Sequence, residues 1–216
     1  LESGIVSADD HLADDHVSAT GFRNFDRIWL GSVPIRQALA SSRNVPAVKL
    51  LQHSGLYRTY GVFNDLQLHS YEVPVERYGL GMAVGGLPVT MEMLARAYTV
   101  FTSKGNLMPL NWYHLPENGQ SPEQRSESVQ YNEKRPEGGR RIFSPRTVDW
   151  INEYLIDPMA RLPSFPRMGN LEYDYPVAVK TGTSEGCRDA WTVAWSTRYL
   201  VVTWLGRPDG QPMNGV

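Results

Sequence analysis

A positively charged residue and several hydroxyl groups lie together in the segment Lys180, Thr181, Gly182, Thr183 and Ser184. An ammonium group with neighbouring hydroxyl donors suits a carboxylate, because charge-assisted hydrogen bonds are among the strongest in proteins. Gly182 carries no side chain, as expected where a ligand or another backbone comes close to a strand. A bare strand edge can also take an extended peptide as an added strand. The segment therefore allows two interpretations: a site for a peptide-like carboxylate, or the solvated end of a surface strand.

Ser42 and Asn44 form a second candidate, separated by one arginine on a predicted connection between two helices. Their side chains hydrogen-bond readily to nearby backbone groups, so helix capping is one interpretation of the pair. The other is acyl transfer, in which a serine hydroxyl reacts only when a nearby base takes its proton, a contribution of ~10²–10⁴-fold. Such chemistry also needs fixed donors for a tetrahedral intermediate, each worth roughly 10²–10³ in rate. The spacing alone does not separate these interpretations.

The sequence around Lys180 predicts an antiparallel sheet. Residues 190–195 and 199–205 are rich in β-branched and aromatic side chains, and only three residues join them, which predicts a hairpin. The apolar run that leads into the lysine predicts a third strand, Val177 to Thr183, beside the hairpin. Because the runs are apolar on both faces, we expect helices on both sides of the sheet. Lys180 is therefore expected on a strand and not on a mobile loop.

Apolar residues at helical spacing predict five helices, and with the sheet they make the fold class α+β. Ser32 is expected to cap the first helix, with Pro34 in its first turn, where the missing N–H does no harm. Thr90 is expected to cap the fourth helix, and Ser144 precedes the fifth. The predicted helices are 32–40, 45–55, 57–66, 90–105 and one that starts after 144.

Two polar regions are predicted to be loops. Residues 1–31 contain Asp9-Asp10-His11 and Asp14-Asp15-His16, whose spacing fits neither a calcium loop nor a two-histidine helix site. A solvated loop without a metal is the favoured interpretation. Residues 111–140 are rich in Glu, Gln, Ser, Gly, Pro and Arg, which predicts an insertion or mobile loop. Its flanks, 107–113 and 140–143, could pair as a small hairpin.

Composition bounds the class of protein. The 216 residues, 41% of them hydrophobic, suffice for one sizeable core, and a formal net charge of -2 gives no electrostatic footprint for nucleic acid. Cys187 is the only cysteine, so the chain cannot form an intrachain disulfide. No apolar run approaches the length of a membrane span. The glycines of residues 79–86 lack the strand–glycine–helix context of a nucleotide site, so no cofactor is predicted.

Taken together, the serine–asparagine and lysine–threonine–glycine patterns resemble two of the three motifs of penicillin-binding proteins and serine β-lactamases. Residues 38–48 look like the segment around the second motif of bifunctional (class A) penicillin-binding proteins, and residues 88–101 resemble their central helix. Residues 186–191 and 205–210 are most similar to the subgroup called penicillin-binding protein 1C. The resemblance covers most of residues 20–212.

The resemblance implies a β-lactamase/transpeptidase-like (penicillin-recognising) fold, with an antiparallel sheet flanked by helices and an all-α subdomain, incomplete in this chain. It implies a D,D-transpeptidase that cross-links peptidoglycan. An active serine attacks the penultimate D-alanine carbonyl of a stem peptide and expels the terminal D-alanine, and the amine of a second stem then takes the acyl group. β-Lactams mimic the D-Ala-D-Ala end and trap the serine.

The family's pattern also implies a role for each matching residue. Ser42 would relay a proton toward the leaving amine, and Asn44 would hydrogen-bond the substrate's amide carbonyl and the base lysine. Lys180 would supply positive charge beside Ser42. Thr181 and Thr183 would hold the substrate carboxylate, and the backbone N–H of Thr183 would be half of the oxyanion hole. The implied substrate-binding segment comprises Thr181, Gly182, Thr183 and Ser184.

The third motif of the family, Ser-x-x-Lys, is absent. The chain has four lysines, and none has a serine three places before it: the residues there are Pro46, Phe101, Tyr131 and Val177. In the family this motif carries the nucleophile and its base, on a helix some tens of residues before the second motif. Leu1 is not a natural start, so we expect a piece of a longer protein whose nucleophile serine and base lysine lie outside this chain.

On this view, residues 1–216 are the C-terminal portion of one transpeptidase domain: 20–106 mainly helical with the Ser-x-Asn motif, 107–143 a variable insertion, 144–216 a helix, the Lys-Thr-Gly strand and the hairpin. Expected partners are stem peptides ending in D-Ala-D-Ala, β-lactams and the rest of the same domain. The full-length protein is expected on the periplasmic side, anchored in the inner membrane. The alternative is a non-catalytic sensor or scaffold of the same fold that binds muropeptides or β-lactams.

Overall fold

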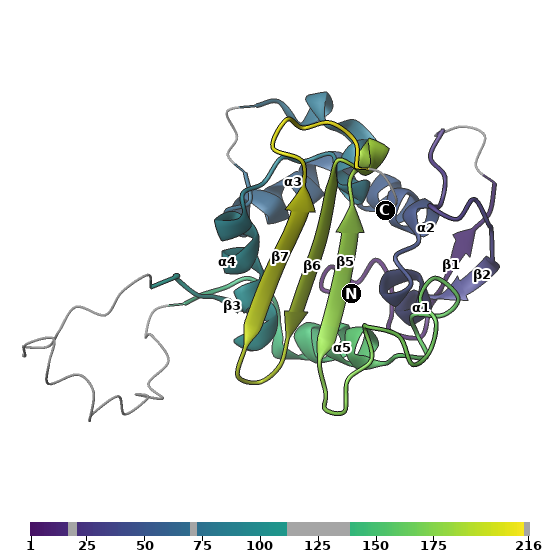
Figure 1. Cartoon of the computed structure of the whole chain (residues 1–216). Coiled ribbons are helices and arrows are strands. Elements are labelled where there is room, and N and C mark those ends of the chain that lie inside the picture. Colours follow the sequence, from purple (N-terminus) through teal and green to yellow (C-terminus); the bar gives the residue numbers. More distant parts are fainter. Residues whose placement is uncertain (17–20, 70–72, 112–138, 214–216) are drawn as a thin grey trace, which may run out of the picture.

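The computed structural model describes residues 1–16, 21–69, 73–111 and 139–213. Its central sheet consists of β5 (Ala178–Thr183), β6 (Asp189–Trp195) and β7 (Leu200–Gly206), all antiparallel in the order β5-β6-β7. The predicted lysine strand and hairpin are therefore confirmed. Among the described residues β5 pairs on one side only, so its other edge is free there, and Figure 1 shows this edge turned toward α1 and α2.

The register of the sheet decides what each face carries. Ala178 lies opposite Trp195, and Lys180 lies opposite Val193. Since side chains alternate along a strand, Lys180 shares the face of Ala178, which is the face that packs on the helices. The chain thus brings its central lysine to the inner side of an edge strand, where it can reach across to another layer.

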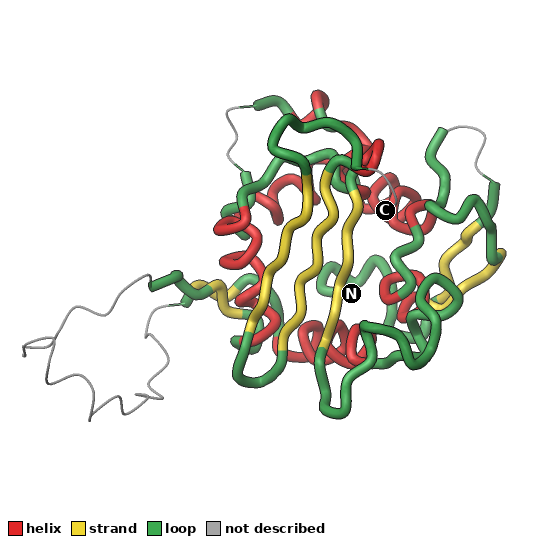
Figure 2. The backbone as a smooth tube through the Cα atoms, viewed as in Figure 1, coloured by secondary structure: helices red, strands yellow, loops and turns green. Residues whose placement is uncertain are grey.

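In the part of the chain that the structure describes, five α-helices lie behind and beside this sheet, and Figure 2 shows them in red next to the yellow strands. Short two-stranded sheets lie apart from it, and short 3₁₀ helices join the larger elements. The helices are α1 (Ile35–Ala40), α2 (Asn44–Ser54), α3 (Leu56–Asp65), α4 (Met91–Thr102), α5 (Pro145–Ile156), η1 (Val75–Arg77), η2 (Gly79–Val84) and η4 (Glu185–Cys187). The short strands pair β1 (His11–Asp14) with β2 (Gly31–Pro34) and β3 (Asn106–Leu107) with β4 (Arg140–Arg141).

The helix starts were predicted with one error. Thr90 and Ser144 accept hydrogen bonds from backbone N–H groups of α4 and α5, as their capping roles require. Ser32, however, does not cap α1, because it lies in β2, where its backbone is paired with Ala13. The first helix consequently begins three residues later, at Ile35. The hairpin flanking the 111–140 region is confirmed as β3 and β4, and residues 112–138 lie outside the described residues.

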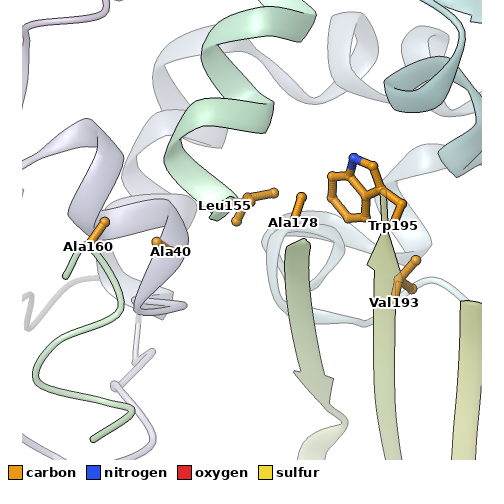
Figure 3. Packing of buried hydrophobic residues seen from close by; sticks show 6 residues of the cluster. All are labelled: Ala40, Leu155, Ala160, Ala178, Val193 and Trp195. Carbon is orange, nitrogen blue, oxygen red and sulfur yellow. The ribbon is translucent and has the colours of Figure 1, made fainter. Parts of the chain in front are cut away.

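The core lies between the inner face of the sheet and the helices. Figure 3 shows its buried members, Ala40, Leu155, Ala160, Ala178, Val193 and Trp195. The Trp195 ring stacks on Phe101 with centroids 5.4 Å apart, and its Nε1 donates to Asn152 Oδ1 at 2.9 Å. This hydrogen bond satisfies the one polar atom of the buried indole. The core thereby joins α4 and α5 to the strand that follows the lysine strand.

Helices cover only one face of the sheet within the described residues. α4 packs on β7 and α5 packs on β5. By alternation, Val201 and Leu205 belong to the opposite face, and they are 51% and 63% exposed. The expectation of helices on both sides therefore holds for one side in this part of the chain. None of the described helices is long and apolar enough to cross a membrane.

Leu155→Ala is expected to lower the free energy of unfolding by about 2–5 kcal/mol, because it leaves a cavity in the core. Leu205→Ala, on the exposed face, is the matched control and should change it by less than about 0.5 kcal/mol. Urea denaturation followed by tryptophan fluorescence measures both values. Equal losses for the two variants would contradict the placement of the core.

Candidate active site

The amino group of Lys180 and the hydroxyl of Ser42 are in direct contact. Lys180 Nζ donates a hydrogen bond to Ser42 Oγ at 2.6 Å, although the two residues are 138 positions apart in the sequence. A second bond runs from the same nitrogen to the backbone oxygen of Thr181 at 2.7 Å. The predicted meeting of the two candidate patterns is thus present in the fold. A contact between two residues this far apart in the sequence is improbable by chance.

Ser42 reaches the lysine because the chain reverses sharply after α1. The backbone N–H of Ser42 donates to Leu39 O at 3.2 Å, and that of Arg43 donates to Ala38 O at 2.9 Å. These two bonds form a Schellman motif, in which the residue after the helix takes a left-handed conformation. Ser42 occupies that position with φ 59°. Glycine is usual there, because a left-handed backbone costs other residues roughly 1 kcal/mol.

Arg43 fixes this turn through the ion pairs of its buried guanidinium. Only 3% of Arg43 is exposed, and its guanidinium donates to the carboxylate of Asp14 at 2.8 Å and to that of Asp26 at 2.6 Å. Asp14 is fully buried in β1, which corrects the prediction of a solvated loop over residues 1–31. Charged residues are seldom buried unless paired, so an acidic pattern read alone suggested solvent. The sequence feature that could have indicated a buried acid is Arg43, the arginine between Ser42 and Asn44.

Asn44 begins α2 and lines the same cavity as Ser42 and Lys180. Its Nδ2 donates to the backbone oxygen of Arg23 at 3.0 Å. The cavity has a volume of about 410 Å³. Apart from these polar groups its wall is mostly apolar, with Leu12, Ile35, Leu39, Leu50, Ala83, Phe101, Phe143 and Ile151 among the lining residues. The predicted wall carrying serine, asparagine and lysine together is therefore present.

The free edge of β5 offers backbone groups to the cleft. Ser184 N donates to Asp189 O, and in an antiparallel ladder such bonded pairs alternate with non-bonded ones. The N–H and C=O groups of Thr181 and Thr183 therefore point away from β6, toward the open edge. Their hydroxyls lie on the face opposite the side chain of Lys180, since side chains alternate along the strand. A ligand along this edge would meet the lysine on one side and the hydroxyls on the other.

Two residues of the segment are placed differently from the others. Ser184 turns its hydroxyl inward, where it donates to Asp189 Oδ2 at 2.9 Å and accepts from the backbone N–H of Asp189. It fixes the end of β5 and the start of β6. At Gly182, an added Cβ would come no closer than 3.9 Å to Trp191, an ordinary contact. Among the residues that the structure describes, none therefore requires a glycine at this position.

Burial controls the charge of the site. Removal of water from the ammonium group lowers the pKa of Lys180 from 10.5 to about 8. Most of the lysine remains positively charged at pH 7, and it can lose its proton at a mildly alkaline pH. The described residues contain no group of three or more His, Cys, Asp or Glu side chains that could hold a metal ion. The chemistry that these groups support is acid–base and electrostatic, around a serine hydroxyl and an anion.

A sequence model of the penicillin-binding protein transpeptidase domain matches residues 1–209. The chain belongs to this family. The transpeptidase fold also agrees with solved structures: penicillin-binding protein 1A from Haemophilus influenzae superposes with a TM-score of 0.71 at 18% identity, over 98% of this chain and 37% of that one.

Curated relatives of this transpeptidase domain are class A penicillin-binding proteins. Penicillin-binding protein 1C from Escherichia coli is 28% identical over 100% of this chain and 25% of its own length. Penicillin-binding protein 1B from Vibrio cholerae is 28% identical over 88% of this chain and 23% of its own length. The resemblance drawn from the sequence is therefore confirmed. The chain spans about a quarter of the length of these relatives.

The side chain of Lys180 is expected to titrate near pH 8 instead of near 10.5. Because the folded-state pKa lies below the unfolded value, its contribution to stability should rise with pH between these limits. Carbon-13 NMR of lysine-labelled protein measures the midpoint, with the signal assigned by its loss in Lys180→Met. A midpoint at the ordinary lysine value would contradict the buried position of the amine.

Proposed function

We propose that this transpeptidase domain is part of a serine D,D-transpeptidase that cross-links peptidoglycan stem peptides on the periplasmic side of the membrane, and that it is a target of β-lactams. The observation that carries the proposal is the 2.6 Å hydrogen bond from Lys180 to Ser42 beside the free edge of β5. It joins a cation, a proton-carrying hydroxyl and a peptide-binding edge in one cleft. Family membership supports the same reaction class.

The edge of β5 suits the end of a stem peptide. An extended peptide can pair with the outward backbone groups of Thr181 and Thr183 as an added strand. Its terminal carboxylate would then lie between the ammonium of Lys180 and the two threonine hydroxyls. The outward N–H of Thr183 is available as one oxyanion donor, in the direction expected for a carbonyl in the cleft. These four groups act on substrate without any rearrangement of the strand.

Ser42 is suited to relay a proton. Lys180 is charged at neutral pH and donates to Ser42 Oγ, so the oxygen acts as acceptor in that bond. The proton of the hydroxyl itself is then free to pass to a leaving amine, while the lysine supplies a replacement. Ser42 is a poor candidate for the nucleophile, because its partner is a protonated lysine and not a base. Asn44, on the same wall, would hold the substrate's amide carbonyl once its side chain turns from Arg23.

The nucleophile in this proposal comes from a Ser-x-x-Lys segment in residues preceding Leu1 in the full-length protein. The largely apolar cavity of about 410 Å³ beside Ser42 and Lys180 supports this assignment. A helix that places a serine and a lysine one turn apart carries apolar residues on its other face, and those residues would fill such a cavity. The serine would then enter the cleft from the side opposite the β5 edge.

A labelled penicillin is expected to modify the full-length protein on a serine upstream of Leu1, and to leave residues 1–216 alone unmodified. The reason is that no serine of this chain has a lysine one helical turn after it to act as base. Mass spectrometry of the digested adduct locates the modified peptide. An adduct on Ser42 would overturn the role assigned to it, and reversible binding without any adduct would favour a sensor.

Lys180→Ala in the full-length protein is expected to slow acylation by penicillin by at least the equivalent of ~1.5–3 kcal/mol, the worth of a hydrogen bond to a charged group. The rate for the unchanged protein should also fall as pH rises through about 8, because Lys180 loses its charge there. Lys180→Arg keeps its charge to much higher pH, so its slower reaction should lack this alkaline decline. Stopped-flow measurements between pH 6 and pH 10 would test both, and a decline shared by Lys180→Arg would assign it to another group.

A further inference from the structure

We propose that Asp14 is a positioning residue for this reaction: its buried carboxylate holds the turn of residues 41–44 so that Ser42 Oγ stays on Lys180 Nζ. The proposal rests on the proposed function and adds to it a residue from outside the cleft. Asp14 lies in β1 and acts through Arg43, so it contacts neither substrate nor the reacting hydroxyl.

The Asp14 carboxylate is completely enclosed and fully used. Its Oδ2 accepts from Arg43 Nε at 2.8 Å and from Leu30 N at 3.2 Å. Its Oδ1 accepts from Asn24 Nδ2 at 2.6 Å. None of Asp14 and only 3% of Arg43 and of Asn24 is exposed. A buried charge needs such partners, so the four residues form one unit that cannot rearrange piece by piece.

This unit holds the catalytic turn at two points. Arg43 directly follows Ser42, and its guanidinium also donates to Asp26 and to the backbone oxygen of Ile28. On the other side of Asn44, the backbone N–H of Val45 donates to Asn24 Oδ1 at 3.1 Å. Asn24 therefore links Asp14 by hydrogen bonds to the first turn of α2, where backbone N–H groups lack partners within the helix. Both ends of the Ser42–Asn44 segment are tied to one carboxylate.

Ser42 needs this support because its backbone is left-handed at φ 59°. A non-glycine residue keeps such a conformation only where the surroundings over-determine it. The contact with Lys180 is one hydrogen bond at the end of a flexible side chain, which cannot supply that constraint. A small displacement of the hydroxyl would separate the proton relay from its cation, and misplacement by about 1 Å can cost ~10²-fold in rate.

Asp14→Asn in the full-length protein tests the proposal. The substitution keeps the shape of the side chain but replaces one acceptor oxygen by an NH₂ group that faces a donor, either Arg43 Nε or Asn24 Nδ2. Acylation by labelled penicillin should slow by ~10–100-fold. The alkaline decline of the rate should move above pH 8, because a displaced Ser42 admits water to Lys180 and its pKa rises.

Asp15→Asn is the matched control. It makes the same change of charge one residue along the chain, where Asp15 forms an exposed ion pair with Lys49 at 2.5 Å. Its rate should stay within about twofold of the unchanged protein, since surface ion pairs contribute little. The position of the alkaline decline separates positioning from mere instability, because a loss of folded protein lowers the amount that reacts without moving the pH of the decline.

Asn24→Ala decides the matter if Asp14→Asn does not fold. It breaks the link from Asp14 to Val45 but leaves the Asp14–Arg43 pair intact, and it should slow acylation by more than about threefold and shift the decline in the same direction. A folded Asp14→Asn, or else Asn24→Ala, with the rate and pH profile of the unchanged protein would overturn the positioning role. Failure of the unchanged protein to form any serine adduct would instead overturn the proposed function.

Discussion

The hydrogen bond from Lys180 on the sheet to Ser42 beside the helices depends on most other features of this fold. The lysine must stand on the inner face of an edge strand, which the three-stranded register provides. The serine must project from a tight turn between α1 and α2. Water must be kept from the ammonium group, because its lowered pKa and its strong attraction for anions both come from burial. The helices α4 and α5 fix the sheet behind it through the core that contains Trp195.

The elements that local sequence determines were predicted well. Lys180 follows an apolar run and precedes two strand-like runs with a short connection, and these short-range signals predicted the strand order. Thr90 was predicted as a cap, and Ser144 as the residue before a helix, from equally local signals. In the structure each accepts a hydrogen bond from a backbone N–H three residues away. The contact of Ser42 with Lys180 was predicted from a resemblance to a family, because no local pattern relates residues 138 apart.

What the sequence did not reveal depends on partners far away in the chain. Asp14 looks like a solvated acid until Arg43 and Asn24 enclose it. Ser32 has the right residue type for a cap, but pairing with β1 placed it in a strand, so a long-range backbone contact overrode a local preference. Helices were expected on both faces from hydrophobicity alone, which indicates that a residue is apolar but not what covers it.

The left-handed conformation of Ser42 lowers the stability of the fold but keeps a hydroxyl group at this position. Glycine would relax this turn, since it adopts a positive φ without steric cost, but it has no hydroxyl to give. A search for more stable sequences would therefore favour a replacement here that removes the hydroxyl we propose as a proton relay. If the buried Asp14 beneath Arg43 holds this strained turn, as we propose, then thermal stability and the proposed proton relay are expected to trade against each other at the same residue.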